Sequence, residues 1–445
     1  MNNSIADIVN NDLCVGCGIC VSESKSSKMI WNQYGFLVPK LDDSFNETAI
    51  KVCPFNTSPE DSVRDEDHLA NIFLKDAKNI DDKIGKFENT YVGYSKANRE
   101  KSSSGGLATY IFEQLLRRKI VNHIFVVKQV NGTYAYQWFN EAEHILKVSK
   151  TRYIPVTLEN LFKEIDQKDG KVAVSGVACF TKAIRLKQHY KPEYKEKIPF
   201  IVGIICGGLK SSFFSDYLAQ KSGIEGSYSK QEYRIKDPAS NAVDYSFGAF
   251  NQENKFYQMK MKTVGDMWGT GLFKANACDF CDDVTTELAD ISLGDAWLDP
   301  YTKDGKGTSV IVSRTQFADQ IIKEGILKKE LSVTTLSLDS FKASQAGSFK
   351  HRQLGESFRL NKLKKSKSIL PYKRKRMLKS IPMEFKIVQN ARMTIRKASL
   401  EIWKNTQKSE LFDLEILPYK KRLKRKTRWY HRIQNLRLKL GLKKL

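Results

Sequence analysis

Eight cysteines are the residues of this 445-residue chain whose spacing most directly predicts chemistry. Three of them, Cys14, Cys17 and Cys20, recur every third residue in NDLCVGCGIC. In ferredoxin-type sites such a C-x2-C-x2-C loop wraps one iron–sulfur cluster, and a distant Cys followed by Pro supplies the fourth thiolate. The chain's only Cys-Pro pair is Cys53-Pro54, and Ser24 occupies the usual local fourth position. We therefore predict a 4Fe–4S cluster bound by Cys14, Cys17, Cys20 and Cys53.

A zinc knuckle, or a set of unrelated buried thiols, is the alternative for these four cysteines. Zinc sites usually pair two separate C-x2-C hooks, whereas here two spacers share the middle cysteine. Gly16 and Gly18 also suit a cluster, because small residues in a short turn let backbone N–H groups point at its sulfurs. The spacing thus favours the cluster.

The other four cysteines form a second candidate set. Cys278 and Cys281 make a C-x2-C hook in ANACDFCDD, while Cys179 and Cys206 end the apolar runs KVAVSGVAC and IPFIVGIIC. Both runs are typical of buried strands, and α/β sheets build their sites at the carboxyl ends of strands. A lone buried cysteine is more often core packing, and four thiolates with one hook also suit tetrahedral zinc. From spacing alone, a second cluster and a structural zinc both remain open.

Composition indicates a globular protein that we expect in the cytoplasm. The apolar fraction of 41% is ordinary, and the longest apolar run, residues 198–206, is far short of the roughly 20 residues that span a bilayer. The opening MNNSIADIVN has neither the basic nor the apolar block of a secretory signal. In the cytoplasm thiols stay reduced, so eight cysteines predict metal or redox work rather than disulfides.

The net charge of +24 is concentrated in a C-terminal tail. Residues 361–445 contain 27 Lys and Arg but 5 Asp and Glu, whereas the preceding residues are nearly balanced. The charge is therefore no sign that the whole protein binds nucleic acid, and we do not favour a nucleic-acid partner.

The sequence pattern predicts an α/β (α+β) fold in three parts. Residues 1–60 form a small cluster module, and the polar stretch TSPEDSVRDEDHL that follows is a linker candidate. From about residue 90, apolar runs alternate with helical patterns, which predicts at least partly parallel strands. We expect a hairpin around Asn131-Gly132, a helix after SSSGG, a helix over TLENLFKEIDQK, and strands in ADISLGDAW and TSVIVSRT.

Five motifs occur in an order known from one protein family. They are SSSGG, VSGVACFTKAIRL, VGIICGG, CDFCDDVTTELADISLGDAW and GTSVIVSRT. Residues 85–345, which carry them, resemble the beta subunit of coenzyme F420 hydrogenase/dehydrogenase, a family that includes 7-hydroxymethyl chlorophyll a reductase. The resemblance implies a domain that binds flavin adenine dinucleotide (FAD) and iron–sulfur clusters. Such proteins pass electrons between clusters and a hydride acceptor through the flavin.

The resemblance also implies site residues. It makes Cys179, Cys206, Cys278 and Cys281 the ligands of a second 4Fe–4S cluster. It makes SSSGG a flavin site, where a glycine turn and a helix N-terminus suit a pyrophosphate, although such a turn is more often a plain helix start. The residues implied in flavin binding are Ser104, Gly105, Gly106, Thr109, Arg152, Tyr153, Gly294, Asp295, Trp297, Thr308 and Ser309.

We therefore predict an iron–sulfur flavoprotein oxidoreductase that takes electrons from a ferredoxin-like donor. Its substrate would be a small or lipid-linked organic molecule, reached by hydride transfer. The sequence ACFT replaces the family's Pro-Cys-Gln around Cys179, so the contacts on the substrate side lack a family counterpart, and no catalytic residue can be named. The rival is a non-catalytic binding or assembly protein with structural metal sites, associated with a membrane surface in polysaccharide biosynthesis.

The tail, residues 360–445, predicts basic amphipathic helices. Residues three and four apart fall on one helix face. One apolar stripe is Phe385, Val388, Ala391, Ile395, Ala398 and Ile402, and the other is Trp429, Ile433, Leu436 and Leu440. The helices could pack on the catalytic domain, lie on the anionic inner face of a membrane, or bind nucleic acid or an acidic partner, and these interpretations remain open.

Overall fold

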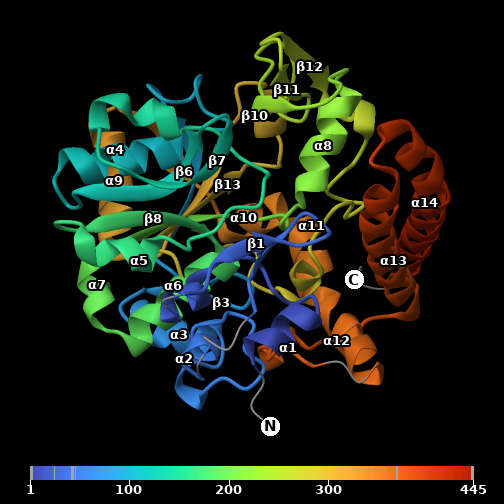
Figure 1. The fold of residues 1–445 in the computed structure, drawn as a ribbon, viewed down its shortest axis with the longest axis horizontal. Coiled ribbons are helices and arrows are strands. Elements are labelled where there is room, and N and C mark those ends of the chain that lie inside the picture. Colours follow the sequence, from blue (N-terminus) through green and yellow to red (C-terminus); the bar gives the residue numbers. More distant parts are fainter. Residues whose placement is uncertain (1–3, 25, 42–44, 46, 367–368, 442–445) are drawn as a thin grey trace.

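A computed structural model describes residues 4–24, 26–41, 45, 47–366 and 369–441 of the chain. Its centre is an eight-stranded sheet with helices on both faces (Figure 1). The strand order is β15 (Leu331–Thr335), β5 (Asn89–Ser95), β14 (Ser309–Ser313), β13 (Ile291–Asp295), β9 (Phe200–Ile204), β8 (Val172–Val177), β6 (His123–Val130) and β7 (Thr133–Phe139).

The sheet is mixed, which confirms the expected α/β class. Strands β6, β8, β9 and β13 run parallel to one another, and the remaining neighbours pair antiparallel. Val177 of β8 is in register with Ile204 of β9, which is in register with Leu293 of β13. The carboxyl ends of these three strands therefore meet at one edge, where sites of α/β sheets form.

The alternation of side chains along each strand builds two cores, one on either face of the sheet. Ile124 and Ala173 face one core, and their neighbours Phe125 and Val174 face the other. Helices α4 (Leu107–Arg117) and α9 (Gln316–Leu327) cover the first face. The second is covered by α5 (Leu161–Glu164), α6 (Ala178–Tyr190) and α7 (Glu193–Lys197).

The N-terminal segment adds to the second core. Leu13, Val15 and Ile19 are buried there together with residues of α6. The segment and its continuation comprise α1 (Ile5–Asn10), β1 (Met29–Trp31), β2 (Leu37–Pro39), α2 (Glu47–Lys51), α3 (Glu66–Phe73), β3 (Asn79–Asp81) and β4 (Gly85–Phe87).

A third core joins a small antiparallel sheet to the C-terminal helices. The sheet is β10 (Tyr228–Ile235), β11 (Ser246–Asn251) and β12 (Phe256–Lys260), next to α8 (Ser212–Lys221). After α10 (Leu338–Ser344) and α11 (Ala346–Phe349) come α12 (Glu356–Lys365), α13 (Met383–Thr406) and α14 (Ser409–Lys439). Helices α13 and α14 lie side by side at one edge of the molecule (Figure 1). No helix in the described ranges has the length and apolarity needed to cross a bilayer.

The local expectations are mostly confirmed. Asn131 and Gly132 join β6 to β7 with positive φ angles of 48° and 84°, as a two-residue hairpin turn requires. The expected helix over residues 157–168 begins only at Leu161, because the backbone N–H of Leu158 bonds the carbonyl of Cys17 at 2.9 Å and holds the segment on the cysteine loop. It continues after α5 as the 3-10 helix Ile165–Gln167. Strand β8 ends at Val177, so Cys179 lies in the first turn of α6 rather than at the end of a strand.

The two predicted tail stripes differ in their surroundings. Phe385, Val388, Ala391 and Ile395 of α13 are buried in the third core, and Ala398 and Ile402 pack against it. On α14, by contrast, Trp429, Leu436 and Leu440 are exposed. The buried side of that helix carries Phe412, Ile416, Leu423 and Tyr430 instead.

Candidate functional site

The first four cysteines lie on two short segments of the N-terminal module. Cys14 and Cys17 precede the 3-10 helix Ile19–Glu23, which contains Cys20, and Cys53 follows α2. Gly16 and Gly18 have φ angles of +71° and +77°, which favour glycine. The backbone N–H of Gly16 donates to Cys14 Sγ at 3.4 Å, the kind of N–H to sulfur contact predicted for the loop.

The thiols of this first quartet are buried or half-buried and interact with one another. Burial raises the pKa of Cys14 to about 11 and that of Cys17 to about 12. Burial also raises the pKa of Cys20, and the neighbouring thiols of Cys17, Cys14 and Cys53 raise it further. Thiolates in such a place need a bound positive charge beside them, which is what a metal site provides.

The second four cysteines meet at the edge where β8 and β9 end. Cys179 lies in the first turn of α6, and Cys206 follows β9. Cys278 lies in the 3-10 turn Asn276–Phe280, and Cys281 is the residue after it. Two backbone N–H groups point at their sulfurs: Gly208 donates to Cys206 Sγ at 3.3 Å and Leu209 to Cys278 Sγ at 3.2 Å. The structure thus brings together two lone cysteines and a hook that are far apart in sequence.

The two quartets are neighbours. Burial, followed by the thiols of Cys281, Cys278 and Cys206, raises the pKa of Cys179 well above its ordinary value, and Cys17 of the first quartet contributes as well. Leu158, next to the loop that carries Cys17, is buried in the same core as residues of α6. Two sites held by these quartets would be adjacent, as electron transfer between them requires.

Arg352 is a residue of the second site that sequence reasoning missed. Its Nη2 donates to Cys281 Sγ at 2.8 Å and to the carbonyl of Asp283 at 2.6 Å, and its Nε donates to the carbonyl of Cys281 at 3.0 Å. Its Nη1 donates to the carbonyl of Cys206. Arg352 lies in the π-helical turn Lys350–Leu354, and nothing local in the sequence distinguishes it from the other basic residues nearby.

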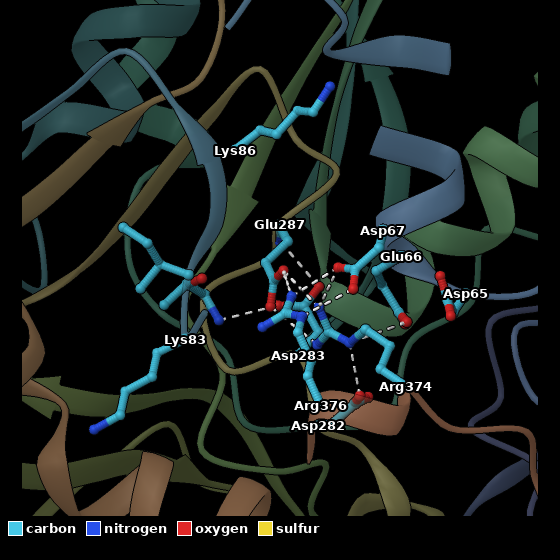
Figure 2. Close-up of polar contacts among 12 residues, drawn as sticks. Asp65, Glu66, Asp67, Lys83, Lys86, Asp282, Asp283, Glu287, Arg374 and Arg376 are labelled. Atoms are coloured by element: carbon cyan, nitrogen blue, oxygen red, sulfur yellow. Dashed lines mark hydrogen bonds and ion pairs between the residues drawn. The ribbon is translucent and has the colours of Figure 1, made fainter. Parts of the chain in front are cut away.

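A buried ion network anchors the segment before α13 beside the hook (Figure 2). Arg374 Nε donates to Asp282 Oδ2 at 2.8 Å, and its Nη1 and Nη2 donate to the two carboxylate oxygens of Glu287 at 2.7 and 3.0 Å. Arg376, nearer the surface, donates to Asp67 at 2.7 and 2.8 Å. Although burial opposes it, Arg374 and Lys373 hold the pKa of Asp282 far below its usual range.

Neither quartet is arranged around a single point. Across the described ranges, no group of three or more His, Cys, Asp or Glu side chains is placed to hold one metal ion. In a cubane cluster each thiolate binds a different iron, so its ligands surround a group larger than one ion. The donor chemistry of both quartets, four buried or half-buried thiols with N–H groups aimed at sulfur, fits such a cluster.

The SSSGG turn lies against the start of β14, so the structure brings together two of the segments assigned to the flavin. The N–H of Gly105 donates to Ser309 Oγ at 3.1 Å, and Ser104 Oγ donates to the carbonyl of Thr308 at 3.2 Å. Gly106 begins α4 with no side-chain cap and a φ of +77°, and a Cβ there would meet the carbonyl carbon of Asn98 at 2.7 Å. Gly106 is therefore required by the protein's own backbone, whether or not a cofactor approaches it. Thr109 is buried in the first turn of α4.

Asp295 and Trp297 lie beside this turn, where Arg234 of β10 binds both. Asp295 is in register with Ser309 across β13 and β14. Arg234 Nη1 donates to Asp295, and its guanidinium stands 5.4 Å from the Trp297 ring. Lys236, two residues on, donates to the carbonyl of Ser104 at 3.2 Å. Arg234 and Lys236 are further site residues that the sequence patterns did not indicate.

Three of the predicted flavin residues are engaged by the protein itself. Arg152 stacks its guanidinium 4.2 Å from the Tyr134 ring and donates to the carbonyls of Thr151 and Ser149. Tyr153 packs edge-on against Trp268 at 4.7 Å. A Cβ at Gly294 would meet Ile205 side-chain atoms at 2.8 Å, so this glycine permits packing against the segment that leads to Cys206.

Several buried polar atoms around the SSSGG turn have no hydrogen-bond partner within the described part of the protein. They are Asn98 Nδ2, Ser102 Oγ and Arg234 Nε. Unpaired buried polar atoms are costly, so a group of them at one place indicates a polar ligand. Together with the uncapped N-terminus of α4, which favours an anion, they fit the phosphate and ribityl part of a flavin dinucleotide.

Comparison with known proteins places this architecture in a family. The profile for the amino-terminal part of the coenzyme F420 hydrogenase/dehydrogenase beta subunit matches residues 90–163, and the profile for the carboxy-terminal part of the same protein matches residues 169–338. The N-terminal cysteine module and the tail lie outside both matches.

Two curated relatives are distant in sequence. The chain is 22% identical over 356 residues to the coenzyme F420-dependent sulfite reductase of Methanocaldococcus jannaschii, an alignment that covers 76% of this chain and 50% of that protein. It is 22% identical over 303 residues to a subunit of the F(420)H(2) dehydrogenase of Methanosarcina mazei, covering 66% of this chain and 78% of that one. The chain thus spans about half the length of the first relative.

A solved structure shares the fold. It is a chain of the F420-reducing NiFe hydrogenase complex from Methanosarcina barkeri, studied by xenon derivatization, with a TM-score of 0.51 and 20% identity over 66% of this chain and 99% of that chain. With both halves of the beta-subunit profile matched in order across most of the sheet, the chain belongs to the family of coenzyme F420 hydrogenase/dehydrogenase beta subunits, whose relatives above are oxidoreductases or subunits of them.

Proposed function

We propose that the protein is an iron–sulfur flavoprotein oxidoreductase with two 4Fe–4S clusters and one FAD. The observation that carries the proposal is the pairing of two four-thiol sites, which adjoin each other through Cys17 and Cys179. A single structural site would need no such neighbour, whereas two adjacent redox centres form a path for electrons.

Each quartet would hold one cluster. Cys14, Cys17, Cys20 and Cys53 would bind the first, and Cys179, Cys206, Cys278 and Cys281 the second. When bound, the clusters supply one-electron transfer, and the flavin exchanges electrons singly or in pairs. The protein contributes burial, N–H donors to sulfur and the positive charge of Arg352, all of which set a cluster's potential.

The flavin would lie at the SSSGG turn, at the edge of the sheet that also holds the second quartet. Ser104, Gly105, Thr308, Ser309 and Asp295 would surround it. The uncapped start of α4 would face its pyrophosphate, and the unpaired polar atoms nearby would find partners in it.

The proposal also assigns a direction of electron flow and the two reactants. We propose that a ferredoxin-like donor reduces the first cluster in the module of residues 1–60 and that the domain of residues 85–345 delivers hydride to an organic substrate. Coenzyme F420, after which both curated relatives are named, is one substrate to test. These parts would work in the cytoplasm, and the basic helices α12, α13 and α14 of the tail pack against them.

The competing proposal is a non-catalytic protein with two structural zinc sites. Cysteine variants distinguish the two. We expect Cys53→Ala, purified without oxygen, to lose about half of the iron and Cys281→Ala to lose the other half, because each removes one ligand of one cluster. Both should keep FAD that acid releases. A colourless protein whose variants lose zinc instead would overturn the redox proposal.

A further inference from the structure

Helix α14 presents a face that nothing in the described part of the chain covers. The buried side of the helix faces α13 and the third core, and it carries Phe412, Ile416, Leu423 and Tyr430. On the outward side, Leu414 is 68% exposed, Trp429 42% and Leu436 59%. This exposed face also carries cations three and four residues apart. They are Lys421, Arg425, Arg428 and Arg432.

The face has one sign of charge over most of its length. From residue 416 to residue 439 the helix has ten Lys and Arg and no Asp or Glu. A groove of 740 Å³ beside it is lined by Trp429, Ile387 and six Lys or Arg side chains of α14. A second groove of 1010 Å³ shares Lys426 with the first and is lined by lysines of α12, α13 and the segment between them. Every charged residue that lines either groove is Lys or Arg.

We propose that this face of α14 binds the surface of an anionic phospholipid membrane. The helix, of 31 residues, would lie in the plane of the interface, about 45 Å along its axis. Its leucines and Trp429 would enter the boundary between headgroups and acyl chains. Its lysines and arginines would extend to the phosphates, since their long side chains reach past buried apolar surface.

The exposed apolar side chains favour a membrane over other anionic partners. A nucleic acid would neutralise the cations, but its phosphates would leave Leu414, Leu417 and Leu436 in water. A membrane satisfies both kinds of residue at once, because apolar burial and electrostatic attraction add at its surface. The α13–α14 pair stands at one edge of the molecule, where a flat surface can reach α14 from outside (Figure 1).

Vesicle co-sedimentation tests the proposal on the full chain. The probes are vesicles of phosphatidylcholine alone and of phosphatidylcholine with phosphatidylglycerol. We expect binding to the anionic vesicles only, weakened by salt. A triple variant, Arg425→Gln, Arg428→Gln and Arg432→Gln, should bind about 100-fold more weakly, at roughly a factor of five for each cation.

A second triple variant, Leu414→Ser, Leu417→Ser and Trp429→Ser, should bind at least about tenfold more weakly while keeping all of the charge. All six replaced residues are exposed, so circular dichroism and the unfolding temperature should match the wild type. The matched control is Leu327→Ser, Lys328→Gln and Lys329→Gln, an exposed apolar and basic site at the end of α9, which should bind like the wild type.

Three results would overturn the proposal. One is no binding of the full chain to anionic vesicles at low salt. Another is vesicle binding by the second triple variant that equals binding by the wild type, because the face would then act through charge alone. The third is tighter binding to duplex DNA than to vesicles, lost with the arginines but not with the leucines, which would assign the face to nucleic acid. None of these results bears on the iron and flavin content.

Discussion

Arg352 is the residue that most directly couples the protein to the second quartet. Its guanidinium is buried and donates to Cys281 Sγ at 2.8 Å. A positive charge and a hydrogen bond beside a cluster thiolate stabilise the more negative, reduced form, and so raise the reduction potential. The family match ends at residue 338, so this contact comes from a part of the chain outside it.

We therefore expect Arg352→Gln to shift the midpoint potential of one cluster to a more negative value and to leave the other unchanged. Arg352→Lys keeps the charge and should retain most of the potential. Electron paramagnetic resonance during an anaerobic redox titration measures both clusters separately. Equal shifts in both, or none in either at full iron content, would contradict the role given to Arg352.

Two adjacent serines of the SSSGG turn separate flavin binding from folding. Ser102 Oγ is buried and has no hydrogen-bond partner among the residues that the structure describes, whereas Ser103 Oγ accepts the N–H of Thr151 at 2.8 Å. Ser102→Ala should leave the stability of the flavin-free protein unchanged and weaken flavin binding by about 1 kcal/mol, because only the ligand would pair that hydroxyl. Ser103→Ala should instead lower the free energy of unfolding by about 1 kcal/mol. Unchanged flavin affinity in Ser102→Ala would place the flavin elsewhere.

At the scale of elements, the segment between α12 and α13 is part of the folded body, although it looks like solvated charge in the sequence. Arg374 is 1% exposed and neutralises Asp282 and Glu287, which are also buried. A chain that ends at residue 360 would leave these carboxylates without their partner. Truncation there is therefore a poor test of the tail, and exposed-face variants are better.

Arg374→Met should lower the free energy of unfolding by about 3–5 kcal/mol, because it removes the nearest cation of two buried carboxylates. Arg376→Met is the matched control. Arg376 also pairs with Asp67 but is partly exposed, so its loss should cost less than about 1 kcal/mol. Denaturant titration under argon measures both. Equal effects of the two substitutions would contradict the ranking.

Glu356, the first residue of α12, predicts a pH dependence. Burial, and after it the charge of Asp282, raises its pKa to about 8, and neither carboxylate oxygen has a hydrogen-bond partner among the described residues. In the unfolded chain the pKa of Glu356 is its ordinary 4.5, so between pH 4.5 and pH 8 the folded protein keeps a proton on Glu356 that the unfolded chain has lost. The stability that this proton supports is full below pH 4.5 and is lost as pH rises toward 8.

Glu356→Gln, a neutral isostere, should therefore stabilise the protein by about 1 kcal/mol or more at pH 8 and change little at low pH. Thermal unfolding of both proteins at several pH values follows the difference. If the difference in unfolding temperature between the two proteins narrows as pH rises, Glu356 is ionised in the folded protein.

At the scale of the whole molecule, the strands and helices could be predicted from the sequence better than the long-range contacts between side chains. The β6–β7 hairpin, the helix after Gly106, and β13 and β14 were predictable because turn residues and apolar periodicity are local signals. The quartet of Cys179, Cys206, Cys278 and Cys281 could be assembled only by counting cysteines and by family resemblance.

The contacts of Arg352 and Arg374 could not be predicted in this way. Their partners Cys281 and Asp282 lie 71 and 92 residues away, and a cation that will be buried looks the same as its solvated neighbours in a basic tail. The one available signal was the acidic stretch CDDVTTELAD, whose four carboxylates are all buried and so need compensating charge.

Metal and flavin analysis of the full chain, purified without oxygen, tests the paired-site proposal most directly. We predict about eight iron atoms and about eight acid-labile sulfides per chain, as two 4Fe–4S clusters require, together with one FAD released by acid. Two zinc ions per chain, with neither iron nor flavin, would contradict it.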